Sequence, residues 1–282
     1  MALVGVASGD LELGQSASVS RTPEKTHAKI SHHTPNIKNK YFFLIVRAIQ
    51  LLTYPVSRIM TWLMRLEVVD ENGTRTNIDQ NVILAASHFS EIDILLVPTI
   101  FKPFSRHFPI RYFTFDTRFY KTQIAGKNLL KKIFYGGWLF RLCGSCEFDR
   151  TQSKKPYHVK LRDHIDLLVR LGHTLLIYPS GHIHADGSVP QVKPGAAVLS
   201  YYSGRPVVPM RVFIDGKITL SNVLFRRVRL RFVIGRQLSQ AKLFPGHDDG
   251  SRASHISDAS PELARANQII FEEFESISNT IV

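Results

Sequence analysis

Short apolar runs alternate with segments of helical periodicity along the middle of the chain, and this alternation predicts an α/β fold. Residues 82–86 are apolar throughout, which is typical of a strand buried on both faces of a sheet. Residues 174–178 and 206–212 are predicted as further strands, each directly after a predicted helix. We therefore expect a single domain in which a central mixed β-sheet is flanked by helices, with motifs at the strand ends.

Glycines mark the ends of two predicted helices. Residues 157–171 place apolar side chains on one helical face, and Gly172 follows as a C-terminal cap. Residues 195–203 form the next predicted helix, which Gly204 closes. A last helix is predicted over residues 262–277.

The N-terminal part of the chain has two segments of different character. Residues 1–39 are poor in large apolar side chains and rich in Ser, Thr, His and Lys, so we expect a disordered arm. Residues 40–66 are strongly apolar, but arginines and Pro55 interrupt them, which predicts a pair of short helices rather than a membrane-crossing span. Arginines beside apolar residues are typical of helices in a membrane interface, so we expect a membrane-docking segment. An amphipathic helix of the core is the alternative.

Positive charge is concentrated in the middle of the chain. Residues 41–245 contain 29 basic and 13 acidic residues, a net charge of +16, whereas residues 246–282 contain two basic and seven acidic residues. Residues 246–282 are predicted to form an acidic loop and a C-terminal helix. The basic region favours an anionic membrane surface or an acidic carrier protein as partner. No zinc-finger spacing, basic zipper or RNA-binding signature accompanies the charge, so no nucleic-acid partner is expected.

His88 and Asp93 follow the first predicted strand. Ser90 and Asp93 have the spacing of a capping box, so we expect Asp93 in the first turn of a helix and His88 in the preceding turn. Within one continuous helix their side chains would point about 140° apart, whereas this junction lets them meet. A carboxylate on one ring nitrogen fixes the imidazole tautomer and leaves the other nitrogen free to take a proton. The alternative is a loop histidine beside a helix cap.

Further motif segments follow this pair in order along the chain. They are residues 144–150, 177–187, 193–197 and 205–210. A glycine and an arginine bound the first, an aromatic-Pro-x-Gly run lies in the second, and a lysine-glycine helix start and a proline-flanked strand make up the others. With the His88–Asp93 pair, they resemble the glycerolipid acyltransferase family, whose members include lysophosphatidic acid acyltransferases. The resemblance covers residues 82–212.

The resemblance implies transfer of a fatty acyl group from a thioester, acyl-CoA or acyl carrier protein, to the hydroxyl of a lysophospholipid such as 1-acylglycerol-3-phosphate. His88 is then the general base, and Asp93 orients it. Arg150 suits an acceptor phosphate because a guanidinium binds phosphate oxygens through two hydrogen bonds, although a strand-end ion pair is the alternative. Backbone N–H groups around Gly181 are expected to stabilise the oxyanion. The implied mechanism requires neither a cofactor nor a metal.

The second segment departs from the family pattern, because Ser180 stands where most members have glutamate. Ser180 can donate and accept a hydrogen bond but carries no charge. The sequence therefore leaves open whether the acceptor headgroup is a phosphate or a neutral group. Acceptor binding is expected from Arg150, Ser180, Gly181 and His182, and oxyanion or structural support from Gly144, Pro179 and Lys193. His182 and His184 form a His-x-His pair, which without a third ligand is weak evidence for zinc.

These features predict a membrane-associated O-acyltransferase whose catalytic domain, residues 67–245, faces the cytoplasm. Cys143 and Cys146 are accordingly expected to be reduced, packed thiols. A lipid-binding protein of the same fold without turnover is an alternative, which the altered Ser180 position favours and the intact His88–Asp93 pair disfavours. A basic nucleic-acid-binding protein is the remaining alternative, supported by charge alone.

Overall fold

The structure of the chain is a computed structural model. It describes residues 38–70, 72–74, 81–90, 93–102, 110–115, 144–148, 161–169, 171–184, 188, 191–246, 256, 257 and 259–279. The predicted disordered arm lies outside the described residues except for its last two positions.

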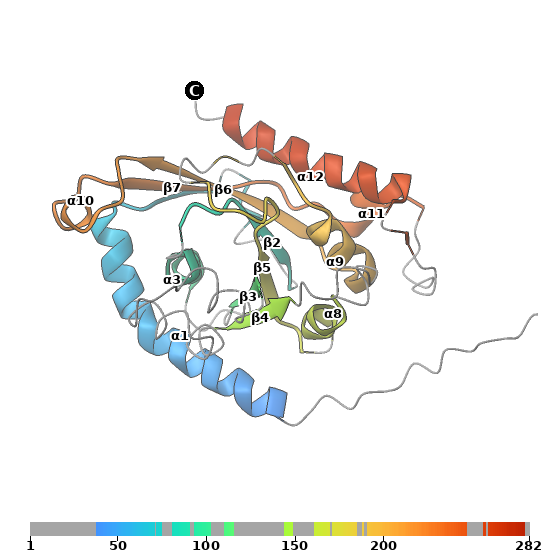
Figure 1. The fold of residues 1–282 in the computed structure, drawn as a ribbon, viewed down its shortest axis with the longest axis horizontal. Coiled ribbons are helices and arrows are strands. Elements are labelled where there is room, and N and C mark those ends of the chain that lie inside the picture. The colour runs from blue at the N-terminus through green and yellow to red at the C-terminus, as the bar shows by residue number, and fades with distance from the viewer. Residues whose placement is uncertain are drawn as a thin grey trace, which may run out of the picture. The chain divides into compact units, whose positions relative to one another are not determined.

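The described strands form one seven-stranded sheet in the order β1-β7-β6-β2-β5-β3-β4 (Figure 1). Their bounds are β1 Glu67–Val69, β2 Ile83–Ala86, β3 Ile110–Phe115, β4 Ser145–Phe148, β5 Thr174–Ile177, β6 Val207–Asp215 and β7 Arg229–Ile234. Neighbouring strands are parallel except for β6 and β7, which form an antiparallel hairpin. The sheet is therefore mixed, as predicted.

Helices cover both faces of this sheet (Figure 1). Their bounds are α1 Lys38–Leu63, α3 Asp93–Leu96, the 3-10 helix η1 Val97–Ile100, α8 Arg162–Val169, α9 Gly195–Ser203, α10 Leu220–Leu224, α11 Gln240–Leu243 and α12 Pro261–Asn279. Helices α8, α9, α11 and α12 pack on one face, whereas α1, α3 and η1 pack on the other.

Strand β2 is buried on both faces because it lies at the centre of the sheet. Ile83 and Ala85 belong to the hydrophobic cluster on the α9 side, and Leu84 and Ala86 belong to the cluster on the α1 side. This confirms the prediction of a fully buried strand from an uninterrupted apolar run.

The predicted helices are present, and Gly204 caps α9 as predicted. Helix α9 ends at Gly204, which has a left-handed φ of 68° and donates its N–H to Ser200 O over 2.9 Å. Gly172, with a φ of 64°, follows the shorter helix α8. The C-terminal helix α12 is confirmed, and its apolar face joins the core cluster on the α9 side through Ile270 and Phe274.

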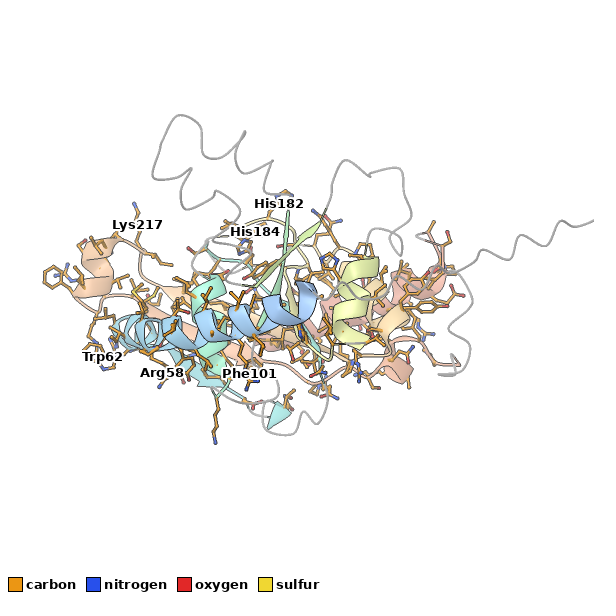
Figure 2. The ribbon with its side chains drawn as sticks, turned by 90° about the horizontal axis from the view of Figure 1, so that it is seen from below. Arg58, Trp62, Phe101, His182, His184 and Lys217 are labelled. Atoms are coloured by element: carbon orange, nitrogen blue, oxygen red, sulfur yellow. The ribbon has the colours of Figure 1, made fainter. Side chains whose placement is uncertain are left out.

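The N-terminal apolar segment is one continuous helix, so the predicted helical pair is wrong. Pro55 lies inside α1 on its exposed side, where water can satisfy the carbonyl that loses its partner. Helix residues before and after Pro55, such as Val46 and Ser57, are buried on the same face. Packing of both halves against the domain therefore keeps them in one helix, which runs across the front of Figure 2.

Gln50 fastens α1 to the sheet. Its side-chain Nε2 donates to the carbonyl of Ile110 over 2.7 Å, and its Oε1 accepts the N–H of the same residue over 3.0 Å. The buried amide thereby pairs both backbone groups at the start of β3. None of the helices in the described part of the chain combines the length and apolar character needed to cross a bilayer.

Candidate active site

The candidate site lies where the parallel strands β2 and β5 end side by side. Ala85 is the register partner of Ile177, so residues 87–90 and residues 178–184 leave the sheet at the same edge. Parallel strands present their following loops at one edge, which is where sites in α/β sheets usually lie.

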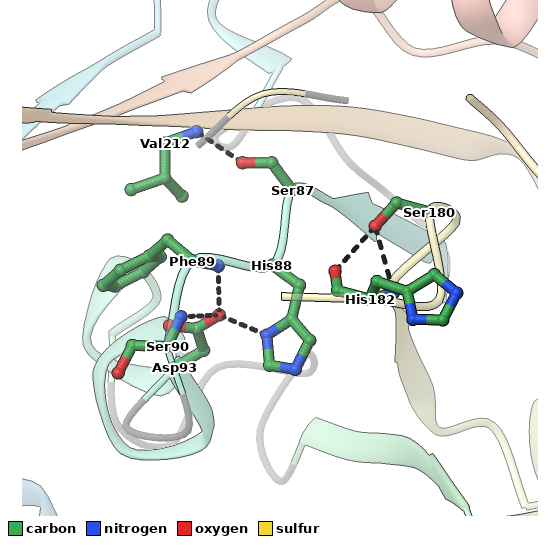
Figure 3. A network of polar contacts seen from close by, with 8 residues as sticks. All are labelled: Ser87, His88, Phe89, Ser90, Asp93, Ser180, His182 and Val212. Atoms are coloured by element: carbon green, nitrogen blue, oxygen red, sulfur yellow. Dashed lines mark hydrogen bonds and ion pairs between the residues drawn. The ribbon is translucent and has the colours of Figure 1, made fainter. Parts of the chain in front are cut away.

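His88 and Asp93 meet as the sequence predicts. Asp93 is the first residue of α3, and its Oδ2 lies 2.8 Å from His88 Nδ1 (Figure 3). The same oxygen accepts the backbone N–H groups of Phe89 and Ser90 over 3.1 and 3.4 Å. The bond from Ser90 is the carboxylate half of the predicted capping box. The turn between strand and helix therefore wraps around one carboxylate oxygen.

Burial makes Asp93 an unusual carboxylate. Its side chain is 1% exposed, and its Oδ1 has no hydrogen-bond partner among the described residues. Burial raises the pKa of Asp93 to about 6, although the hydrogen bonds from His88 and the backbone act in the opposite direction. When ionised, Asp93 accepts a hydrogen bond from the N–H at His88 Nδ1, which leaves Nε2 as the proton acceptor of the ring.

Tyr178, which the sequence did not mark as a site residue, holds the other side of His88. The two rings are stacked, with 4.0 Å between their centroids and 16° between their planes. The N–H of His184 also donates to the backbone carbonyl of His88 over 2.7 Å. The aromatic residue before Pro179 was visible in the motif, but neither periodicity nor spacing shows which ring it contacts.

Ser87 anchors the same loop to β6 and was also missed. Its buried hydroxyl accepts the N–H of Val212 over 2.8 Å, and its own N–H donates to Met210 O over 3.0 Å (Figure 3). A serine after an apolar strand gives no sequence signal for such a bond, because its partner lies 125 residues away.

The turn that contains Ser180 faces the His88 loop, and hydrogen bonds within the turn hold its conformation. Ser180 is buried, and its hydroxyl donates to His182 O over 2.9 Å (Figure 3). Gly181 has a φ of 69°, and its N–H donates to Tyr178 O over 3.0 Å. The turn itself therefore uses the N–H of Gly181, and an oxyanion role for the other N–H groups around Gly181 stays a prediction.

Lys193 covers this turn. Its backbone N–H donates to Pro179 O over 2.8 Å. A Cβ atom added to Gly181 would lie 2.7 Å from Lys193 Nζ, so the ammonium group lies directly against the turn. The structure thus brings Pro179, Ser180, Gly181 and Lys193 together, as the sequence predicts, and the exposed His182 follows them.

One predicted site residue, Gly144, is not part of this cluster. Gly144 precedes β4, which is separated from β5 by β3 in the sheet. It has a φ of 107°, and an added Cβ would lie 2.9 Å from both Gln50 Nε2 and Ile110 O. Gly144 therefore has a packing role under α1. Arg150 lies outside the described residues.

The described residues contain no group of three His, Cys, Asp or Glu side chains arranged to hold a metal ion. His182 and His184 therefore gain no third ligand from the described part of the chain. The arrangement that remains is an imidazole with a buried carboxylate partner, next to a turn that carries the lysine side chain of Lys193. It is suited to removing a proton from a hydroxyl group.

Comparison with known proteins places this geometry in a family. The sequence profile of the Acyltransferase family matches residues 65–213, more than half of the chain. Among solved structures, the chain is similar to the crystal structure of the 1-acyl-sn-glycerophosphate (LPA) acyltransferase PlsC from Thermotoga maritima. The TM-score is 0.48, with 20% sequence identity over 87% of this chain and 84% of that chain. The family match includes His88, Asp93 and the Ser180 turn, and the chain belongs to the Acyltransferase family.

Proposed function

We propose that this acyltransferase moves a fatty acyl group from a thioester, acyl-CoA or acyl carrier protein, to the hydroxyl of a lysophospholipid at a membrane surface. The observation that carries the proposal is the 2.8 Å contact between His88 Nδ1 and the buried Asp93 within a chain of this family. A hydroxyl group is a weak nucleophile, and a positioned histidine base activates it.

In the proposed reaction, His88 Nε2 removes the proton of the acceptor hydroxyl as its oxygen attacks the thioester carbonyl carbon. A C–O bond forms, and the carbonyl oxygen becomes an oxyanion. The oxyanion then collapses, which breaks the C–S bond and releases the thiolate. The imidazolium of His88 returns its proton to the leaving sulfur. Between the two transfers, Asp93 stabilises the imidazolium through its Oδ2.

Lys193 is proposed as a positive group for the acceptor. Its Nζ lies against Gly181, in the turn that follows Tyr178, and Tyr178 stacks on His88. An ammonium there attracts an acceptor phosphate, whereas Ser180 contributes no charge. The proposed acceptor class is a lysophospholipid such as 1-acylglycerol-3-phosphate, and the role of Arg150 in holding its phosphate stays a prediction.

The membrane proposal rests on the outer face of α1. Large apolar side chains recur there at positions i, i+7, i+11 and i+14, and they are exposed: Ile45, Leu52, Val56 and Ile59. The opposite face is buried although it contains polar residues, including Gln50, Ser57 and Thr61. The helix has four basic residues and no acidic one. Apolar side chains turned outward beside basic ones are the pattern of an interfacial helix.

The reaction is tested by incubating the purified chain with a labelled long-chain acyl-CoA and a panel of lysolipids with and without a phosphate headgroup. Products are resolved by mass spectrometry. We expect acylated lysophospholipid with the wild type and a loss of roughly 100-fold or more in kcat with His88→Ala. The control His184→Ala removes a neighbouring imidazole but keeps the backbone N–H that contacts His88, and we expect it to retain most activity.

The donor is tested in the same panel with acyl carrier protein in place of acyl-CoA. Product from one donor alone identifies the thioester that the site accepts. Lipid binding without product from either donor would reject the acyltransfer proposal and favour a lipid-binding protein of the same fold.

A further inference from the structure

Exposed large hydrophobic side chains occur on three segments of the described chain. Besides α1, they lie in the β6–β7 connection and in the loop beside the Ser180 turn. We call the β6–β7 connection, residues 216–228, the hairpin tip. Its three exposed members are Leu220, Leu224 and Phe225, with exposed fractions of 78%, 57% and 71%. Such side chains together on a short connection mark an interaction surface.

The hairpin tip has a defined backbone conformation. Thr219 Oγ1 accepts the N–H of Asn222 over 3.2 Å and caps the start of α10. At its end, the N–H groups of Arg226 and Arg227 donate to Val223 O and Asn222 O over 3.0 and 2.7 Å. These two bonds make a Schellman motif. Val223 is buried in the core cluster on the α1 side, so α10 is held from below while its apolar side chains face outward.

Arg226 occupies a position that usually belongs to glycine. Its φ is 54°, a left-handed conformation that is unfavourable for a residue with a Cβ atom. In this conformation the Arg226 guanidinium carbon lies 4.3 Å from the ring centroid of Trp62 on α1. The contact joins the hairpin tip to the last turn of α1. Figure 2 shows Trp62 and Arg58 at the same end of the domain as α10 and Lys217.

The charges around the exposed apolar residues have one dominant sign. Lys217, Arg226 and Arg227 are exposed, and within the described chain no carboxylate lies within ion-pair distance of any of them. The acidic residue of this hairpin end, Asp215, is the register partner of Arg229. The tip therefore combines an apolar surface with a net positive charge.

A bilayer with anionic lipids matches both properties. Leu220, Leu224 and Phe225 can enter the boundary between headgroups and acyl chains, while lysine and arginine side chains contact the lipid phosphates. Trp62 is a side chain typical of this interface, because its ring is apolar and its N–H is polar. A protein partner would more often place opposite charges around an apolar centre.

We propose that the hairpin tip is a second membrane-docking element, which seats the enzyme on an anionic lipid surface together with α1. The inference deepens the proposed function and rests on its membrane surface, since it names the lipid charge and the residues that meet it. Two contacts, on α1 and on the tip, restrict how the domain can rotate on the surface. Helix α3, which carries Asp93, packs against α1, so the seated orientation also orients the candidate site.

The experiment measures binding of the full chain to vesicles of phosphatidylcholine alone and of phosphatidylcholine with phosphatidylglycerol in equal parts. The apolar variant is Leu220→Ser/Leu224→Ser/Phe225→Ser. The charge variant is Arg226→Gly/Arg227→Ala, in which glycine keeps the left-handed position without strain. The matched control is Lys242→Ala/Arg265→Ala, which removes two exposed cations from α11 and α12 on the other face of the sheet.

We expect the apolar variant to lower the partition coefficient on anionic vesicles at least tenfold. The charge variant should lower it by about 5-fold per removed cation, a value that follows from about 1 kcal/mol for each basic residue near an anionic surface. Its binding to neutral vesicles should change little, and the control should bind both vesicles as the wild type does. Thermal unfolding shows whether each variant is folded, and the charge variant should be about as stable as the wild type because glycine removes the left-handed strain at position 226.

Wild-type binding by both tip variants would overturn the proposal, and so would a wild type that binds neither vesicle. A wild-type dimer that dissociates in the tip variants, with vesicle binding unchanged, would instead assign the tip to a second copy of the chain. Turnover of a short-chain acyl thioester and a soluble acceptor without vesicles is the separate readout of the reaction. Tip variants should keep this turnover, whereas an inactive wild type would reject the proposed reaction and leave the vesicle result to decide the tip.

Discussion

The ring of Tyr178 stacks on the imidazole of His88, with their planes 16° apart, while Asp93 binds Nδ1 of the same imidazole. The stack sets the plane of the imidazole, and the hydrogen bond sets its rotation within that plane. The three residues come from the ends of two strands and the start of a helix. His88 is therefore held from two directions before any substrate arrives, which lowers the cost of orienting it for proton transfer.

Replacing the stacking ring should slow the reaction without removing the base. For Tyr178→Leu we expect kcat to fall by roughly tenfold, because the imidazole gains freedom to tilt. Tyr178→Phe keeps an aromatic face and should restore most of the rate. Steady-state kinetics of both variants make the test. Equal values of kcat for Tyr178→Leu and the wild type would show that the stacked ring does not position His88.

The Asp93 carboxylate should matter more for the rate than for stability. In Asp93→Asn the amide oxygen can still accept the backbone N–H groups of Phe89 and Ser90, but the amide no longer stabilises an imidazolium. We expect kcat to fall by about 10²–10⁴. The Tm at pH 8 should stay equal or rise, because the substitution removes a buried charge. A large loss of Tm together with activity would mean that the carboxylate acts through folding alone.

The raised pKa of Asp93 predicts how activity depends on pH. The ionised form supports His88, and protonation as the pH falls through about 6 removes that support. We expect kcat/KM to fall below this pH by about tenfold per pH unit. A profile that is flat down to pH 5 would contradict this prediction.

Protonation of Asp93 should affect stability in the opposite direction, because it stabilises the folded state while it lowers the activity. The pKa of Asp93 is 3.8 in an ordinary setting and about 6 here, so the folded state binds the proton more tightly than the unfolded state does. The stabilising contribution is complete below about pH 3.8 and is lost as the pH rises through 6. Its size is roughly 3 kcal/mol. Urea unfolding of the wild type and of Asp93→Asn across pH 4 to 8 separates the contribution of Asp93 to the free energy of unfolding from those of the other titratable groups.

Two left-handed glycines form a matched pair for testing the Ser180 turn. Gly181 and Gly204 have φ angles of 69° and 68°, and alanine at either position should cost about 1 kcal/mol of stability. Gly181→Ala also places a methyl group 2.7 Å from Lys193 Nζ, so the ammonium must move. We expect only Gly181→Ala to raise the acceptor KM. An equal change for Gly204→Ala would mean that stability, and not the turn, determines KM.

The amide of Gln50 should contribute strongly to stability. Gln50→Ala leaves the buried N–H and C=O of Ile110 without their side-chain partners, at an expected cost of about 2–4 kcal/mol in the free energy of unfolding. Gln268→Ala is the control, because its amide contacts the exposed Glu272 on α12. Urea unfolding compares the two. A small effect at Gln50 would show that water replaces its side chain at the start of β3.

Local patterns were sufficient for most elements of the fold. The apolar run at β2, the glycine that closes α9 and the periodicity of α12 each depend on neighbours within a few residues, so they can be read along the chain. Pro55 misled the prediction for the same reason. Its local effect is to interrupt a helix, whereas packing of α1 on both sides of it keeps the helix continuous.

The sequence by itself determined the alternation of strands and helices, the strand-to-helix turn that lets His88 meet Asp93, and the motif order of the family. These follow from hydrophobic period, capping chemistry and spacing, all of which act over short distances along the chain. Only the tertiary structure decided that Tyr178 stacks on His88, that Ser87 bonds to Val212, and that Arg226 covers Trp62. Each of these contacts joins segments that are far apart in sequence, so it exists only once the sheet order brings those segments together.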